Sequence, residues 1–274
     1  DYFYMGQITN DSISDNSITL YDKRKFPYFE GNEDRHIWDY EGEGGQEHGA
    51  GGECIPEWLH NSILTINGPL KRYSNIKKMF IRPTFSHMLV DLVSMNESFS
   101  IPTEISMGFR GFINHNVRVV LANTLNQYKD IKSELYINNK WEGPSKSNSD
   151  IQKQYRSTMN NNIISLCPRG SGIDSTRLFE SCYFTRVPVL ISDHDFYIVG
   201  EDHYDTSFFY RLCNIQNGQP GLGESSLYNE LSKIYNTDIN ELTERAVLAR
   251  KYFDKILREY FKDPTLYFLK WLQK

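Results

Sequence analysis

The sequence predicts an α/β protein with a mainly parallel sheet, and three observations support this prediction. From residue 104 onward, short apolar segments alternate with segments whose apolar residues recur at helical spacing. Glycines follow two of the apolar segments, at points where a strand has to turn towards a helix. The chain of 274 residues, 39% of them hydrophobic, is long enough to bury one large core or two small ones.

The elements are expected in a regular order. Strands are predicted over residues 2–8, 62–66, 77–83, 104–111, 133–138, 162–168 and 187–193. Helices are predicted over residues 114–128, 149–159, 175–184, 238–261 and 264–273. Asp238 and Glu241 have the spacing of a capping box at the start of the long helix. The acidic, glycine-rich segment 30–53 is expected to form a long mobile loop.

Charge and cysteine content exclude several classes of protein. The formal net charge is −5, which does not suit a polybasic protein that binds nucleic acid. No apolar run approaches the roughly 20 residues that span a bilayer, and no signal-peptide pattern is present. The four cysteines are widely spaced, which is typical of reduced thiols rather than of a disulfide framework. We therefore expect a cytoplasmic protein without a transmembrane segment.

The segment 166–181, LCPRGSGIDSTRLFES, has the residue types of an anion-binding turn. A strand, a glycine turn and a helix in this order present backbone N–H groups at a helix N-terminus, where the helix dipole favours an anion. Gly170 and Gly172 allow a close approach of the backbone, and Arg169 and Arg177 supply charge and bidentate hydrogen bonds. The candidate caps, two of which carry a hydroxyl for a phosphate, are Asp174, Ser175 and Thr176.

Acidic and basic residues near this turn extend the hypothesis to a nucleotide. Glu180 lies one helical turn after Arg177, where a carboxylate can accept hydrogen bonds from ribose hydroxyls. The alternative is that the two residues form an exposed pair and that the glycines only make a turn. Arg110 follows a strand and either reaches the phosphates or lies on the surface, whereas Arg118 is expected to be structural.

Residues 167–193, CPRGSGIDSTRLFESCYFTRVPVLISD, resemble the signature of exostosin-type glycosyltransferases. The resemblance extends back through MGFRG and VRVVLANTL and covers roughly residues 104–212. It implies a GT-B fold, in which two Rossmann-like domains enclose a cleft, with the first domain reduced here and with no obligatory metal. The expected domains are an acceptor-side domain over 1–102 with a glycine-rich loop over 40–53, a nucleotide-sugar domain over 103–262, and a C-terminal helix over 263–274 that packs back on the first domain.

The same resemblance assigns roles to the turn. The loop Arg169–Gly172, which includes Gly170 and Ser171, would face the diphosphate together with Ser175 and the adjacent Thr176. Arg177 would counter the charge of the diphosphate, and Glu180 would hold the ribose. The implied activity is transfer of a sugar from a nucleotide sugar, expected to be UDP-linked, to a glycan hydroxyl, as in polysaccharide biosynthesis. No cofactor is expected.

The sequence contains several candidates for the catalytic base and a candidate metal cluster. Asp39 is the preferred base because it lies between an apolar anchor and the glycine-rich loop. Its rivals are Glu41, Glu43 and His48, and each could equally belong to a solvated loop. A second acidic cluster could bind a metal but is expected not to, because Asp193 ends a strand; its members are Asp193, His194, Asp195 and His203.

Two other functions compete with a glycosyltransferase. A phosphotransferase could use the same turn as an anion cradle, but the lysine of a P-loop is missing. A non-catalytic nucleotide- or glycan-binding protein on a degenerate glycosyltransferase fold would suit the short first half. Cys167 adjoins the turn and is expected to be a buried, unreactive thiol.

Overall fold

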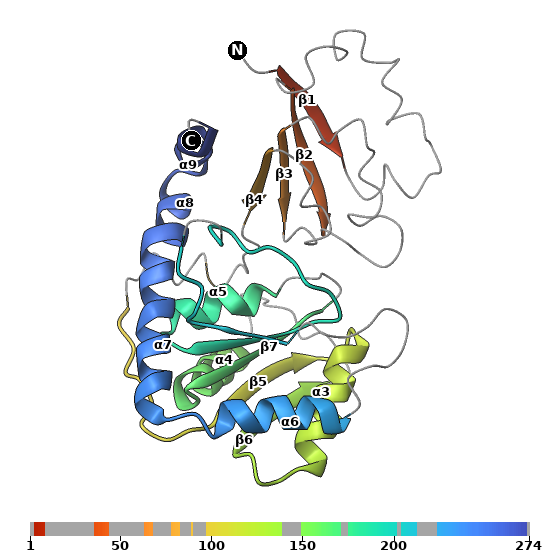
Figure 1. The fold of residues 1–274 in the computed structure, drawn as a ribbon, viewed down its shortest axis with the longest axis vertical. Coiled ribbons are helices and arrows are strands. Elements are labelled where there is room, and N and C mark those ends of the chain that lie inside the picture. The colour runs from red at the N-terminus through yellow and green to blue at the C-terminus, as the bar shows by residue number, and fades with distance from the viewer. Residues whose placement is uncertain are drawn as a thin grey trace.

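The computed structural model describes residues 3–8, 36–43, 63–67, 78–82, 89, 97–138, 149–170, 175–201, 204–212 and 224–272. Two parallel sheets are present in this part of the chain (Figure 1). The α/β prediction is therefore confirmed. In the described residues, no helix is long and apolar enough to cross a bilayer.

The first sheet has four strands in the order of the chain: β1 (Phe3–Ile8), β2 (His36–Glu43), β3 (Ile63–Asn67) and β4 (Lys78–Arg82). The prediction of a mobile loop over 30–53 is wrong for β2, which pairs with β1 and β3. Ile37, Trp38 and Tyr40 favour a strand, and the acidic residues between them obscured this pattern. Residues 30–35 and 44–53 of the predicted loop lie outside the described part.

The second sheet has five parallel strands in the order β6-β5-β7-β8-β9. Their bounds are β5 (Met107–Phe112), β6 (Ser133–Asn138), β7 (Ile164–Pro168), β8 (Val187–Ile191) and β9 (Tyr210–Leu212). The chain moves from β5 to β6 on one side and then to β7 on the other side. The direction of winding thus reverses between β5 and β7, which is the point where open α/β sheets bind ligands.

Helices cover both faces of the second sheet (Figure 1). Three helices connect strands of this sheet: α3 (Asn116–Gln127), α4 (Ser149–Asn161) and α5 (Thr176–Tyr183). A fourth helix, α6 (Glu224–Tyr235), follows β9. Alternate residues of the buried strands belong to different cores: Leu166 and Val189 pack with α3 and α6, whereas Cys167 and Leu190 pack with α5. The sequence predictions omitted β9 and α6.

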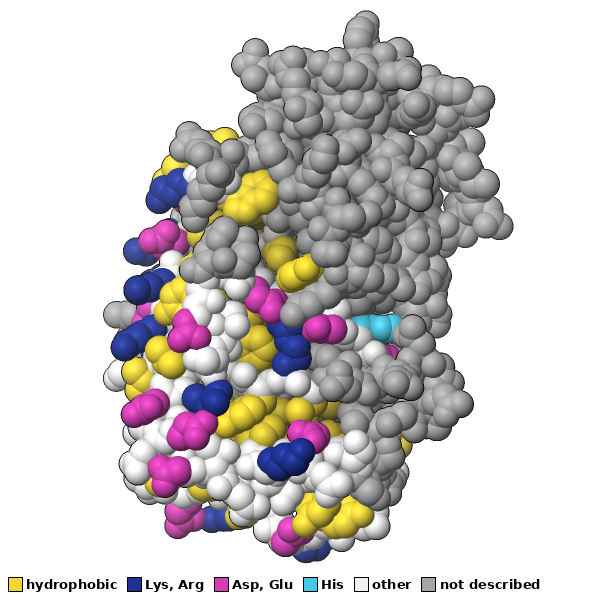
Figure 2. All heavy atoms as spheres, viewed as in Figure 1, with side chains coloured by type: hydrophobic (Ala, Val, Ile, Leu, Met, Phe, Trp, Pro, Cys, Tyr) yellow, Lys and Arg dark blue, Asp and Glu magenta, His cyan; other side chains and the backbone are white. Residues whose placement is uncertain are grey.

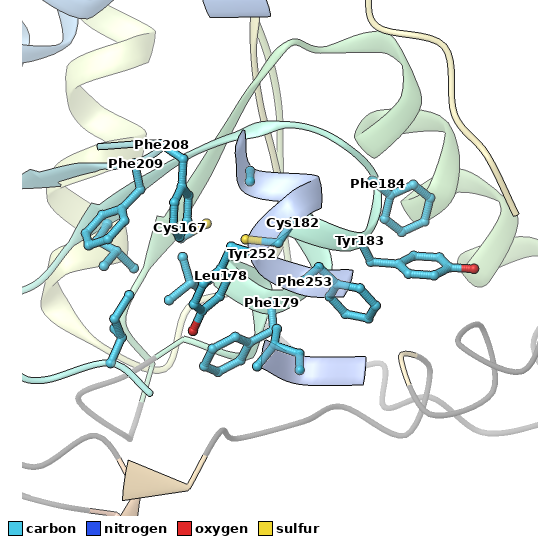
Figure 3. Packing of buried hydrophobic residues seen from close by; sticks show 14 of the residues in the cluster. Cys167, Leu178, Phe179, Cys182, Tyr183, Phe184, Phe208, Phe209, Tyr252 and Phe253 are labelled. Carbon is cyan, nitrogen blue, oxygen red and sulfur yellow. The ribbon is translucent and has the colours of Figure 1, made fainter. Parts of the chain in front are cut away.

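The predicted long helix is continuous but contains a π-helical turn. It consists of α7 (Ile239–Tyr252), a π turn over Phe253–Leu257, and α8 (Arg258–Lys262). Asp238 caps it by accepting from the Asn240 N–H at 2.8 Å. Tyr252 and Phe253 are consecutive and both are fully buried, against α5 and the side chains around Cys182 (Figure 3). The wider π turn begins where these two neighbouring rings enter the core.

The last helix, α9 (Pro264–Leu272), contacts the first sheet. The ring of Phe80 in β4 lies 4.8 Å from that of Phe268 and 5.3 Å from that of Trp271. Phe80 is 4% exposed and its partners Phe268 and Trp271 are half-buried, so this aromatic cluster joins β4 to α9. The domain boundaries given above stay a prediction.

Arg186 is a buried cation whose partners are backbone carbonyls. Its guanidinium donates to the carbonyls of Met159 at 2.6 Å and Asn160 at 3.1 Å, which lie at the end of α4, and to that of Ser100 at 3.0 Å. Burial lowers the pKa of Arg186 to about 10, so it stays charged at neutral pH. The charge complements the negative end of the α4 dipole and ties this end to the segment before β5.

The turn after α5 contains a threonine in the left-handed region. Thr185 has a φ of 61°. Its N–H donates to the Cys182 carbonyl at 3.2 Å, and the Arg186 N–H donates to the Ser181 carbonyl at 2.9 Å. These two bonds form a Schellman motif, in which glycine is the preferred residue at the position of Thr185.

We expect Thr185→Gly to be more stable than Thr185→Ala by about 1 kcal/mol, because a Cβ is unfavourable in the left-handed region. The free energy of unfolding in urea measures this difference. The alanine variant controls for loss of the threonine side chain. Equal stability of the two variants would contradict the assigned conformation.

Candidate functional site

The candidate site lies at the carboxyl edge of the second sheet, where β5 and β7 separate. β5 pairs with β7 only at Met107 and Gly108, whereas it pairs with β6 along its whole length. The N–H groups of Met107 and Ile113 both donate towards β6. Because backbone groups alternate along a strand, those of residues 108, 110 and 112 point towards β7. Beyond Gly108, these groups need partners other than β7.

Two arginines donate to the carbonyls of residues 110 and 112. Arg177 of α5 donates through Nη2 to the Arg110 carbonyl, and Arg118 of α3 donates through Nη1 to the Phe112 carbonyl at 2.8 Å. Arg118 also donates through Nε to the Arg169 carbonyl at 3.0 Å, at the end of β7. The opening between β5 and β7 is therefore lined by guanidinium groups from two helices.

The charges of these arginines lie close together, and the described part of the chain gives neither of them an acidic ion-pair partner. Burial, followed by the nearby charge of Arg177, lowers the pKa of Arg118 to about 10. Among the residues that the structure describes, neither arginine forms an ion pair with a carboxylate. The site consequently has a surplus of positive charge that an anion would relieve.

Arg177 is restrained by two aromatic rings. The Cζ atom lies 4.6 Å from the ring centroid of Phe109 and 4.8 Å from that of Tyr155. Its Nη1 is buried and has no hydrogen-bond partner in the described residues. A buried donor without an acceptor is costly, so this atom is suited to an acceptor on a ligand.

Gly170 lies directly against the side chains that follow β5 and begin α3. A Cβ at this position would be 2.8 Å from Nδ2 of Asn114 and 3.0 Å from Nη2 of Arg118. The Oδ1 of Asn114 is also buried and unpartnered in the described part of the chain. Glycine is thus needed at residue 170 for the three segments to meet, and two unpaired polar atoms, Asn114 Oδ1 and Arg177 Nη1, belong to this arrangement.

Arg169 has a different environment. It is 2% exposed, and its Nη1 donates to Oδ1 of Asp193, which follows β8. The same carboxylate lies 3.7 Å from Nε2 of His115 and 4.0 Å from Nε2 of His194. The structure therefore places Arg169 in an ion pair between β7 and β8, and its predicted contact with the diphosphate stays a prediction.

His115 caps α3 through a neutral ring nitrogen. Its Nδ1 accepts from the Val117 N–H at 3.2 Å, which places the ring proton on Nε2. Burial, followed by the charge of Arg169, lowers the pKa of His115, while Asp193 opposes the shift; Arg118 and His194 lower it further. A proton on Nδ1 would break the cap and place a positive charge at the positive end of α3.

Glu180 is buried between α5 and α4. It is 4% exposed, and its Oε2 accepts from the hydroxyl of Tyr155 in α4. Its predicted contact with a ribose stays a prediction. Cys167 is buried as expected, and burial raises the pKa of its thiol to about 11, which makes it unreactive.

The structure brings only some of the predicted residues together. Ser175 is the buried N-cap residue of α5, although its side chain makes no capping hydrogen bond, and Thr176 begins the helix. Arg110 lies over the ring of Tyr136 with 3.6 Å between Cζ and the centroid, and it donates to Gln154. Ser171, Gly172 and Asp174 are outside the described residues.

Three of the candidate bases lie in the first sheet. Asp39 is in the centre of β2 and pairs in register with Gln7 and Thr65. Glu41 and Glu43 belong to the same strand, and His48 is outside the described residues. The role of Asp39 as the base stays a prediction.

The second acidic cluster is divided among other partners. Asp195 pairs with Arg211, which also binds Glu201 at 3.0 Å, and His203 is outside the described residues. Where residues are described, no group of three His, Cys, Asp or Glu side chains is arranged to hold a metal ion.

Three residues of the site were missed in the sequence analysis: Asn114, His115 and Tyr155. Asn114 and His115 follow the carboxyl end of a predicted strand, and this position alone could have marked them. Tyr155 carries no local signal, because α4 meets Arg177 only through the tertiary fold.

Comparison with known proteins identifies a related domain. Residues 94–213 match the family described as the RXYLT1 C-terminal domain, which is glycosyltransferase-related. The match covers less than half of the 274 residues and contains β5 to β9. The earlier resemblance to exostosin-type enzymes is thus supported at the coarser level of a glycosyltransferase-like domain. No curated protein matches the chain.

Two solved structures are similar to the chain. The crystal structure of TarM has 10% sequence identity and a TM-score of 0.42, over 91% of this chain and 57% of that one. The crystal structure of the GtfA/B complex has 8% identity and a TM-score of 0.32, over 83% of this chain and 57% of that one. The chain therefore spans 57% of the length of each of these proteins.

The cap at His115 predicts a pH dependence of stability. The ordinary pKa of histidine is 6.5, and the pKa of folded His115 is lower. As the pH falls below 6.5, the unfolded chain therefore binds a proton before the folded protein does. The free energy of unfolding decreases until the pH reaches the lowered pKa of folded His115. Asparagine can accept the same bond without titrating. His115→Asn should lose less stability between pH 7.5 and 5, by on the order of 1 kcal/mol, as measured by urea unfolding.

His194→Asn is the matched control, because His194 faces the same carboxylate of Asp193 and is not the capping residue of α3. Parallel pH profiles for the wild-type protein and His115→Asn would show that the cap does not titrate.

The close approach at Gly170 predicts a specific coupling. Gly170→Ala should lower the free energy of unfolding by about 1–3 kcal/mol, because the added methyl group overlaps Asn114. In the Asn114→Ala background the same change should cost much less, and a urea-unfolding double-mutant cycle measures the difference. Equal costs in both backgrounds would contradict the contact.

Proposed function

We propose that the protein is a glycosyltransferase that transfers a sugar from a nucleotide-sugar donor, a UDP-sugar by the resemblance stated above, to a glycan hydroxyl without a metal. The observation that carries the proposal is the pair Arg118 and Arg177 at the switch point, together with the buried Nη1 of Arg177, for which the described residues provide no acceptor. Surplus positive charge at this position of a parallel sheet suits the diphosphate of a nucleotide.

The chemistry requires a stabilised leaving group. The acceptor oxygen bonds to the anomeric carbon as the bond from that carbon to the diphosphate oxygen breaks, and the electron pair leaves with the diphosphate. Arg118 and Arg177 are held by backbone carbonyls and aromatic rings before the ligand binds. Such preorganised donors stabilise the negative charge that develops on the leaving group.

The other assignments follow from the same proposal. In the proposed GT-B arrangement, the second sheet with α3 to α8 holds the donor and the first sheet supplies the acceptor side and the base, for which Asp39 is the candidate. Arg169 supports the loop through Asp193 in this scheme. The proton of the acceptor hydroxyl passes to the base.

Removal of Arg177 tests the donor site. Arg177→Ala should weaken the binding of UDP by about 1.5–3 kcal/mol, the range for a lost charged hydrogen bond, as measured by isothermal titration calorimetry without metal. Lys233→Ala removes one positive charge from an exposed pair on α6 and controls for net charge. Unchanged affinity of Arg177→Ala for UDP would overturn the site.

Turnover distinguishes the enzyme from its rivals. The assay measures release of the nucleoside diphosphate from a panel of nucleotide sugars, with and without glycan acceptors. The wild-type protein should be active with at least one donor, and Arg177→Ala should be inactive with it. Binding of UDP without turnover of any donor would instead favour a non-catalytic binding protein. Stabilisation only by ATP with Mg²⁺ would favour a phosphotransferase.

A further inference from the structure

We infer that Glu180 and Tyr155 are positioning residues, which together hold the guanidinium of Arg177 in the orientation that binds the anion. The inference rests on the proposed function. It differs from the sequence-based hypothesis for Glu180, in which this carboxylate binds the ribose directly.

The three side chains form a chain of contacts across two helices. Glu180 and Arg177 lie on α5, and Tyr155 lies on α4. The Tyr155 hydroxyl donates to Oε2 of Glu180, and its ring lies against the Arg177 guanidinium at 4.8 Å. The hydrogen bond thus sets the position of the ring, and the ring forms one wall of the slot that contains Arg177.

A second ring and a backbone carbonyl also hold Arg177. The Cζ atom lies 4.6 Å from the ring centroid of Phe109 in β5, and the Arg110 carbonyl accepts from Nη2. Two rings and the bond at Nη2 together restrict the orientation of Nη1. Nη1 is the buried atom that lacks a partner in the described residues, so its direction decides whether a ligand oxygen can be bound.

Burial makes the hydrogen bond between Tyr155 and Glu180 persistent. Glu180 is 4% exposed, and a carboxylate in such a place needs a donor. Burial raises the pKa of the Tyr155 hydroxyl well above its ordinary value, so the hydroxyl keeps its proton and donates at all physiological pH values. With Oε2 already bonded and the side chain almost inaccessible, Glu180 is better placed to support Tyr155 than to meet a ribose.

The decisive experiment is a double-mutant cycle on UDP affinity, with inorganic pyrophosphate as a second probe. Tyr155→Phe retains the ring and removes the bond to Glu180. It should weaken the binding of both probes about three- to tenfold. In the Arg177→Ala background, the same change should have no further effect on affinity, because Tyr155 acts through Arg177.

Glu180→Gln tests the carboxylate that accepts the bond from Tyr155. It should weaken the binding of UDP and pyrophosphate together and should not change the ratio of affinities for UDP and 2′,3′-dideoxy-UDP. If Glu180 bound the ribose, Glu180→Gln would remove the preference for UDP over 2′,3′-dideoxy-UDP and leave the affinity for pyrophosphate unchanged. Tyr155→Phe would then leave that preference unchanged. That result would overturn the inference.

Tyr252→Phe is the matched control for loss of a buried hydroxyl, because Tyr252 donates to the Val199 carbonyl at 2.8 Å in the core beside α7. It should change stability without changing affinity for either probe. If Glu180→Gln fails to fold, the affinities of Tyr155→Phe for UDP and pyrophosphate, with and without Arg177→Ala, decide whether the positioning role is correct.

The failures of the two proposals are distinguishable. If the wild-type protein binds neither UDP nor pyrophosphate, the proposed donor site and this inference are both wrong. If the wild-type protein binds them and Tyr155→Phe binds them equally well, the donor site stands and the positioning role is wrong.

Discussion

β5 pairs with β7 at two residues only, and beyond them the backbone carbonyls of β5 that face β7 need other hydrogen-bond donors. The carbonyls of Arg110 and Phe112 point into the gap, and a buried carbonyl needs a donor. Guanidinium groups from α5 and α3 satisfy them. The same groups that complete the sheet therefore bring positive charge to its carboxyl edge, so structural support and anion affinity have one origin.

The charges at this edge fall into two sets with different consequences. Arg169 is paired with Asp193, and His115 and His194 lie around the same carboxylate, so this set links the ends of β7 and β8. Arg118 and Arg177 are held by carbonyls and rings instead, and neither forms an ion pair with a carboxylate of the described residues. In the view of Figure 2, acidic and basic side chains are interspersed over the described surface, so the local surplus does not extend into a basic face there.

Aromatic packing connects this edge to the rest of the molecule. Tyr155 and Phe109 enclose Arg177, while the rings of Tyr183, Phe208, Tyr252 and Phe253 fill the core on the far side of α5 (Figure 3). The long helix of α7 and α8 lies along this core and leads to α9, which meets β4 through Phe80. The position of α5, and with it that of Arg177, depends on this packing.

The sequence by itself determined the alternation of strands and helices in the second half, and it located the turn 166–181, because periodicity, glycines and caps are local properties. It misassigned β2, whose acidic residues obscured a strand pattern, and it missed the short β9. Only the tertiary structure decided which arginine has its charge balanced by a carboxylate: Arg169 meets Asp193 at the end of another strand, whereas Arg177 meets Tyr155 from another helix. Pairing of charges and burial of Glu180 arise from contacts between distant segments, which no local pattern records.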